Sequence, residues 1–84
     1  MSQSDSQLSQ SGSASGHLLA LQVNGQVHHC APETALPDLL RQLNMDPRLV
    51  AVEYNGEILH RQFWETTLMQ AGDRLEVVTI VGGG

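Results

Sequence analysis

Two Asn-Gly pairs constrain the fold of this chain more than any other feature of its sequence. Asn24-Gly25 separates the segments LLALQV and QVHHC, and Asn55-Gly56 separates LVAVEY and EILH. An Asn-Gly pair between two β-prone segments favours a two-residue hairpin turn, because both turn positions require a positive φ angle. The sequence therefore predicts two β-hairpins. In the first strand, period-two alternation places three residues on the core face: Leu19, Leu21 and Val23.

Between the predicted hairpins, one apolar stripe has the spacing of a short helix. Four leucines occupy positions i, i+3, i+4 and i+7 of this stripe: Leu36, Leu39, Leu40 and Leu43. Proline is tolerated only in the first turn of a helix, so Pro37 predicts that the helix begins near Ala35. We expect Thr34 to be the N-cap of this helix and Asp46-Pro47 to end it.

After the second hairpin, residues 61–71 have irregularly spaced apolar side chains, which predicts a packed loop with a helical turn. Phe63 and Trp64 are expected to lie in the core, because large aromatic residues supply much of the packing area of small domains. Arg61 is expected to pair with a nearby acidic residue or to contact a partner. The acidic candidates are Glu57 and Glu65.

The predicted element order is ββαββ, loop, β, and the last strand, over residues 74–81, is rich in β-branched residues. With one helix available, we expect an α+β fold in which that helix packs on one face of a mixed four- to five-stranded sheet. If the last strand lies beside the first, the two strands are parallel, as in the β-grasp arrangement of ubiquitin-like proteins. A chain of 84 residues cannot build two independent cores. We therefore expect one domain over residues 17–81, between a disordered Ser/Gln-rich tail at residues 1–16 and a flexible glycine tail at residues 82–84.

Composition argues against several classes of function. The net charge is −5 and all four positive residues are arginine, which is a poor footprint for nucleic acid. No apolar run approaches the roughly 18 residues that a membrane span needs. The N-terminus also lacks the basic start and apolar stretch of a signal peptide. We therefore expect a cytoplasmic protein that binds neither nucleic acid nor membrane.

Signatures of catalysis and metal binding are equally sparse. His28 and His29 are adjacent on a predicted strand, so they point to opposite faces and cannot chelate one ion together. His28 does share a face with Cys30, but two ligands without a third make a weak metal site and a weak nucleophilic pair. The lone Cys30 is expected to be a small buried thiol. The sequence therefore predicts no metal site, no bound cofactor and no enzymatic activity.

The C-terminus carries the informative signal, because the last strand runs directly into Gly82, Gly83 and Gly84. One interpretation is an ordinary frayed end. The other is a tail that enters a narrow channel and presents the terminal carboxylate for reaction, since residues without Cβ atoms can pass where no other residue could. The residues alone leave both interpretations open.

The alternation of the last strand marks a second candidate region. Three residues are expected to face inward: Leu75, Val77 and Thr79. Three others are left on the face away from the helix: Glu76, Val78 and Ile80. A small apolar patch with an acidic neighbour suits a partner-binding surface. A central strand with two apolar faces would have the same pattern, so this interpretation also has an alternative.

Several short motifs occur in a characteristic order along the chain. They are Val-Asn-Gly in the first hairpin, Leu-Leu-x-x-Leu in the helix, Val-Ala-Val-Glu-Tyr-Asn-Gly-Glu in the second hairpin, Arg61-x-x-Trp64, Leu68-x-x-Ala-Gly-Asp73-x-x-Glu76 and the terminal Gly-Gly. Together they resemble the sulfur carriers of thiamine biosynthesis, a ubiquitin-like β-grasp family, over residues 18–84. The extension at residues 1–16 and the third glycine, Gly82, depart from the family pattern.

The resemblance implies a specific chemistry for the C-terminus. The Gly84 carboxylate would be adenylated by an E1-like adenylyltransferase that consumes ATP, and then converted to a thiocarboxylate with sulfur from a persulfide-carrying protein. Thiazole synthase would use this sulfur, and Gly82 and Gly83 would thread the tail into these enzymes. The protein would then be a carrier and not an enzyme. Three alternatives remain: the small subunit of molybdopterin synthase, a ubiquitin-like modifier that forms an isopeptide bond through Gly84, and a plain interaction domain.

Overall fold

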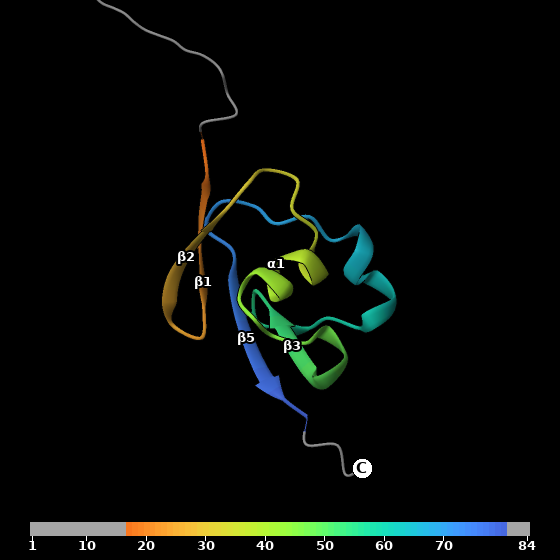
Figure 1. The fold of residues 1–84 in the computed structure, drawn as a ribbon. Helices are drawn as coiled ribbons and strands as arrows, with labels where there is room; N and C mark the ends of the chain where they lie inside the picture. Colours follow the sequence, from red (N-terminus) through yellow and green to blue (C-terminus); the bar gives the residue numbers. More distant parts are fainter. Residues whose placement is uncertain (1–16, 81–84) are drawn as a thin grey trace, which may run out of the picture.

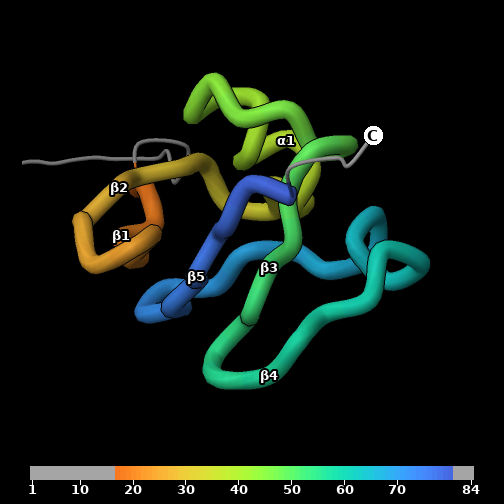
Figure 2. Tube along the Cα trace, turned by 90° about the horizontal axis from the view of Figure 1, so that it is seen from below, coloured from red at the N-terminus to blue at the C-terminus, as the bar shows by residue number. Residues whose placement is uncertain are grey.

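The computed structural model describes residues 17–80; residues 1–16 and 81–84 lie outside the described part, and with them both predicted tails. Five strands form one mixed sheet: β1 (Leu19–Val23), β2 (Gln26–Cys30), β3 (Val50–Tyr54), β4 (Glu57–Ile58) and β5 (Arg74–Thr79). Three helical segments complete the fold: α1 (Leu36–Gln42) and the 3₁₀ helices η2 (Pro47–Leu49) and η3 (Arg61–Thr66) (Figure 1). The strand order is β2-β1-β5-β3-β4, with β5 parallel to β1 and antiparallel to β3 (Figure 2). The predicted mixed sheet with one main helix is confirmed.

Both Asn-Gly pairs form the predicted hairpin turns. Asn24 and Gly25 have φ angles of 53° and 83°, and Asn55 and Gly56 have φ angles of 52° and 92°. The first turn joins β1 to β2 and the second joins β3 to β4, and both strand pairs are antiparallel. Side chains with a branched Cβ are strained at such angles, which explains why Asn and Gly occupy these four positions.

The core lies between α1 and the inner face of the sheet. Its buried side chains are Leu21, Val23, Cys30, Leu36, Leu39, Leu40, Val50, Val52, Trp64, Met69, Leu75 and Val77. The prediction that Phe63 lies in the core is wrong, because its side chain is 47% exposed. Consecutive residues of a short helix point in different directions, and in η3 only Trp64 faces the core.

The start of α1 differs from the sequence-based expectation. Ala35, and not Thr34, is the N-cap residue, and the Thr34 hydroxyl donates a hydrogen bond to the carbonyl oxygen of Ala31 at 2.6 Å. The reason is a contact distant in sequence: the backbone at Ala35 forms an antiparallel bridge with Leu68. This bridge holds the segment before α1 in an extended path that places Thr34 too early to cap the helix.

The end of α1 also differs, because the helix stops at Gln42 and not at Asp46-Pro47. Asn44 has a φ angle of 62°. The N–H groups of Asn44 and Met45 donate hydrogen bonds to carbonyl oxygens in the last turn of α1, at 3.0 and 2.8 Å. This pattern is a Schellman motif, in which a residue in the left-handed conformation closes the helix.

Asp73 is a buried polar residue in the turn before β5, with only 6% of its surface exposed. Its carboxylate accepts hydrogen bonds from the Tyr54 hydroxyl, from the Asn55 side-chain amide at 3.1 Å and from the Gln70 N–H at 2.7 Å. These bonds connect the β3–β4 turn to the start of β5. Burial, together with the Asp73 carboxylate, raises the pKa of Tyr54 above its ordinary value.

The raised pKa of Tyr54 predicts a loss of stability in alkaline solution. The unfolded protein releases the phenol proton near pH 10 while the folded protein retains it, so the free energy of unfolding falls as the pH rises above about 10. The chain has a single tyrosine and no lysine, so few other groups titrate in this range. We expect urea denaturation at a series of pH values to give a smaller alkaline loss for Tyr54→Phe than for the wild type. An equal loss in both proteins would contradict this assignment.

Candidate functional site

The candidate site is the C-terminal end of β5, the last strand before the predicted glycine tail. Gly82, Gly83 and Gly84 lie outside the described residues, so their roles stay predictions. β5 is the central strand of the sheet (Figure 2). Its last part extends past the turn of the β1–β2 hairpin (Figure 1). The geometry of the site therefore depends on what holds the end of β5.

On the β1 side, a side chain replaces a missing strand. The parallel pairing of β1 with β5 ends at Val23 opposite Leu75, and the chain then turns away at Asn24. The Asn24 side chain accepts a hydrogen bond from the Val77 N–H at 2.7 Å and donates one to the Val77 carbonyl oxygen at 3.1 Å. Its amide thus acts as a further peptide group beside β5. Sequence reasoning assigned Asn24 to the turn and missed this second role.

On the β3 side, backbone pairing continues to the end of the described chain. Val50 lies opposite Thr79, and the Ile80 N–H donates a hydrogen bond to the Leu49 carbonyl oxygen at 2.6 Å. Thr79 lies on the inner face as predicted, directly opposite the buried Val50, but its own side chain is exposed. β1 has already ended at this level, so Thr79 has a neighbouring strand on only one side.

The outer face of the sheet, opposite α1, carries an apolar patch beside the end of β5. This outer patch consists of the residues Ala51, Glu53, Ile58, Glu76, Val78 and Ile80. Ile58 and Val78 are 70% and 60% exposed. Most of these residues line a shallow hollow of about 370 Å³. Glu76, Val78 and Ile80 are all exposed, as the predicted placement on the face away from the helix requires. Their role in partner binding stays a prediction.

The charge of the outer patch is negative. Glu53 on β3 lies directly opposite Glu76 on β5. Two like charges in directly opposed positions of an antiparallel pair destabilise the sheet. Within residues 17–80, neither carboxylate has a cation within ion-pair distance. The arrangement suits a partner that supplies basic side chains at this position.

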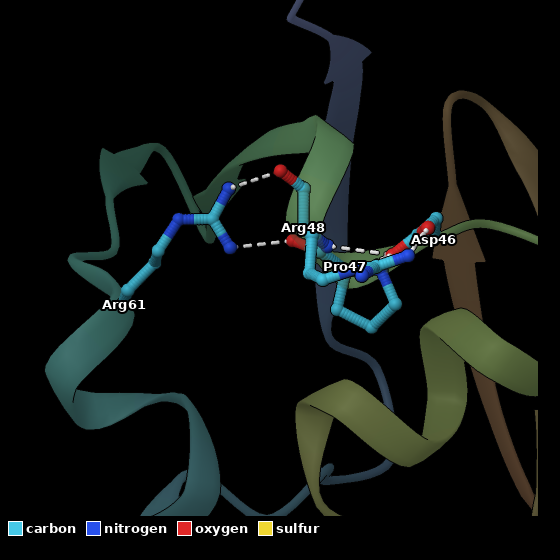
Figure 3. Close-up of polar contacts among 4 residues, drawn as sticks. All are labelled: Asp46, Pro47, Arg48 and Arg61. Carbon is cyan, nitrogen blue, oxygen red and sulfur yellow. Dashed lines mark hydrogen bonds and ion pairs between the residues drawn. The ribbon is translucent and has the colours of Figure 1, made fainter.

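Arg61 contacts neither of the two glutamates that the sequence suggested. Its guanidinium donates hydrogen bonds to three backbone carbonyl oxygens, those of Pro47, Arg48 and Val50. Two of these bonds are drawn in Figure 3, where Arg61 points from η3 toward the turn before β3. The Arg61-x-x-Trp64 spacing was the sequence signal for this residue, but it gives no indication of the contacts.

The described residues form no metal-binding cluster. Among residues 17–80, no three His, Cys, Asp or Glu side chains lie together in a way that could hold a metal ion. Cys30 is buried, as expected, and burial raises the pKa of its thiol. A raised pKa leaves less of the reactive thiolate at neutral pH. No helix within the same residues is long and apolar enough to cross a membrane.

Comparison with known proteins identifies relatives of this chain. The model of the ThiS family matches residues 21–84. The sulfur carrier protein ThiS of Escherichia coli is 30% identical over 61 residues, which are 73% of this chain and 92% of that protein. The thiamine biosynthesis protein ThiS of Geobacter metallireducens has a similar crystal structure, with a TM-score of 0.68 and 33% identity, over 79% of this chain and 100% of that one.

A further relative is much longer than this chain. The thiazole synthase of Paramagnetospirillum magneticum is 35% identical over 66 residues, which are 79% of this chain but 20% of that protein. The matching segment is therefore one part of a larger polypeptide.

Two neighbouring valines of β5 test whether the outer patch is structural. Val77 is 8% exposed and Val78 is 60% exposed. Val77→Asp would bury an unpaired charge and should lower the free energy of unfolding by about 3 kcal/mol or more. Val78→Asp should lower it by only about 1 kcal/mol, the cost of a poor strand former at an exposed position. Chemical denaturation measures both, and equal losses would mean that the outer patch is part of the core packing.

Proposed function

Because this chain belongs to the ThiS family of sulfur carriers, we propose that its C-terminal Gly84 carries sulfur, as a thiocarboxylate, for formation of the thiazole ring of thiamine. An E1-like adenylyltransferase activates the Gly84 carboxylate with ATP and releases pyrophosphate. The terminal sulfur of a protein persulfide then attacks the acyl carbon and displaces AMP, which gives an acyl disulfide with the donor cysteine. A second thiol attacks the donor cysteine sulfur, forms a disulfide with it and releases the thiocarboxylate of Gly84. Thiazole synthase takes this sulfur. The chain itself is a carrier, a protein co-substrate that needs no bound cofactor.

The observation that carries the proposal is the position of three glycines in the sequence shortly after the central strand. Ile80 and Val81 follow β5, and Gly82, Gly83 and Gly84 come next as the last residues of the given sequence. The last four residues, fully extended, would span about 13–14 Å beyond the sheet. Glycines add no side chain to this length, so they suit a channel too narrow for other residues. The absence of a side chain on Gly84 also leaves the activated acyl carbon open to a sulfur nucleophile.

The outer patch is suited to docking by the enzymes that would act on the tail. Val78 and Ile80 are exposed beside the point where β5 leaves the sheet, so a partner that receives the tail can bury them at the same time. Burial of apolar surface provides affinity, while the opposed Glu53 and Glu76 favour a partner with basic residues and increase its association rate.

The relatives named thiazole synthase support the proposed acceptor. In the proteins of Paramagnetospirillum magneticum and Magnetococcus marinus, a segment 35% identical to this chain makes up 20% of the polypeptide. Fusion of a carrier to the enzyme that consumes its sulfur would keep the two at high effective concentration. A separate carrier chain would serve the same enzyme through a docking surface.

Mass spectrometry of the intact protein tests the proposal. The protein should be incubated with ATP, its activating enzyme, a persulfide donor and a thiol reductant. We expect a species in which one oxygen is exchanged for sulfur, mapping to the peptide that ends at Gly84. Gly83→Val should abolish this exchange, because the added side chain blocks the channel, and should leave thermal stability unchanged.

Other outcomes would select other functions. Conjugates that survive boiling in detergent would indicate a ubiquitin-like modifier. An unmodified mass after complete incubation would contradict the carrier function. Normal sulfur loading of Gly83→Val would contradict the argument from a narrow channel.

The outer patch gives a second test with a matched control. Val27 lies on the same face as Val78 but on the edge strand β2, and the two valines are 61% and 60% exposed. Val78→Asp should weaken binding to the activating enzyme by about tenfold or more, because it places a charge in the apolar contact. Val27→Asp should change binding by less than about twofold, as expected for a residue outside the contact. Isothermal titration measures both constants, and equal effects would place the docking surface elsewhere.

A further inference from the structure

We propose that Arg61 is a positioning residue for the C-terminal tail. It holds the backbone around Leu49, and the Leu49 carbonyl oxygen accepts the hydrogen bond of the Ile80 N–H, the last described backbone amide. The inference rests on the proposed function, in which the tail is the part presented to the enzymes. It concerns how the domain fixes the starting point and direction of that tail.

The first step is the single anchor at Ile80. Asn24 holds Val77 from the β1 side, and no strand lies on that side of the residues that follow within the described chain. On the β3 side, the Ile80 N–H donates to the Leu49 carbonyl oxygen at 2.6 Å. The position of Ile80 therefore depends on how firmly the backbone at Leu49 is held.

The second step is the set of bonds around Leu49. The Arg61 guanidinium donates to the Pro47 carbonyl oxygen, to that of Arg48 at 3.3 Å and to that of Val50 at 2.9 Å. These three residues enclose Leu49 on both sides. The Val50 carbonyl oxygen lies on the β4 side of β3, beyond the end of the short β4, so Arg61 occupies the place of a continued strand.

The third step is the placement of Arg61 itself. η3 presents it to the turn, and its guanidinium lies 4.8 Å from the ring centroid of Trp64. The Trp64 ring is in turn fixed, because it is buried and its indole N–H donates to the Leu59 carbonyl oxygen at 2.9 Å. A planar guanidinium held against an aromatic ring can donate hydrogen bonds to three carbonyl groups at once. A lysine ammonium is a compact group at the end of a flexible side chain and cannot reach all three.

The nearby Arg48 provides a matched control, because it has the same charge and an exposed side chain but different contacts. Its guanidinium pairs with Asp46 at 2.9 Å and 3.2 Å, within its own turn (Figure 3). This contact lowers the pKa of Asp46 to about 2. Arg48→Gln therefore removes one positive charge, as Arg61→Gln does, without releasing any carbonyl group around Leu49.

Amide hydrogen exchange followed by NMR tests the proposal without reference to sulfur chemistry. We expect Arg61→Gln to reduce the protection of the Ile80 N–H by about tenfold, while the Leu40 N–H in α1 changes in proportion to global stability only. Arg61→Lys, which retains the charge, should also expose Ile80, because one ammonium cannot bridge three carbonyl groups. Arg48→Gln should leave Ile80 protected.

Kinetics with the activating enzyme provide the functional readout. A tail whose base is less well fixed must be ordered on binding, so Arg61→Gln and Arg61→Lys should raise KM several-fold and leave kcat within about twofold of the wild type. Unchanged Ile80 protection in both variants would overturn the proposal, as would equal loss of protection at Ile80 and Leu40. A wild-type protein that is never activated would contradict the proposed function, and the exchange data would still decide the role of Arg61.

Discussion

The hydrogen bonding of β5 is the constraint on which the rest of this structure depends. A central strand must satisfy its N–H and C=O groups on both sides, because unpaired backbone groups in a sheet are costly. β5 extends beyond the end of its pairing with β1 on one side, and β3 extends beyond its pairing with β4 on the other. In both places a side chain supplies the missing partner: Asn24 bonds to Val77, and Arg61 bonds to Val50.

Because side chains take the place of neighbouring strands at these two positions, the sheet is narrow at this end. At the level of Ile80 the sheet consists only of the chain after β5 and the chain at Leu49, because the pairing of β1 with β5 and of β4 with β3 has ended before it. A narrow end can approach the mouth of a channel more closely than a full five-stranded edge could. For the proposed function the same end must also be rigid, because the free-energy cost of ordering a loose segment on binding lowers the affinity for the partner. Side-chain capping meets both requirements at once.

Local patterns in the sequence predicted most of the fold, because the two hairpins and the helical stripe depend on residues close together in the chain. The error at Thr34 has a different origin. Thr34 lost its capping role to a bridge between Ala35 and Leu68, which are 33 positions apart. The bonds of Asn24 and Arg61 likewise join residues far apart in sequence, and no local pattern indicates them. The Schellman end at Asn44 could have been predicted, since Asn is a common residue at that position of a helix end.

The opposed pair of Glu53 and Glu76 sets the stability of the sheet against the partner recognition that we propose for the outer patch. A sheet selected for stability alone would place opposite charges, or a charge and a polar group, at directly paired positions. Here the repulsion lies on the exposed face, where water screens it and the cost to folding is small. A partner that contributes a basic side chain would relieve this repulsion and exclude the water that screens it, so the interaction strengthens on binding. The described core residues between α1 and the inner face include no such pair. The residues that hold the fold together and the residues that we propose to meet a partner therefore lie on opposite faces of the same strands.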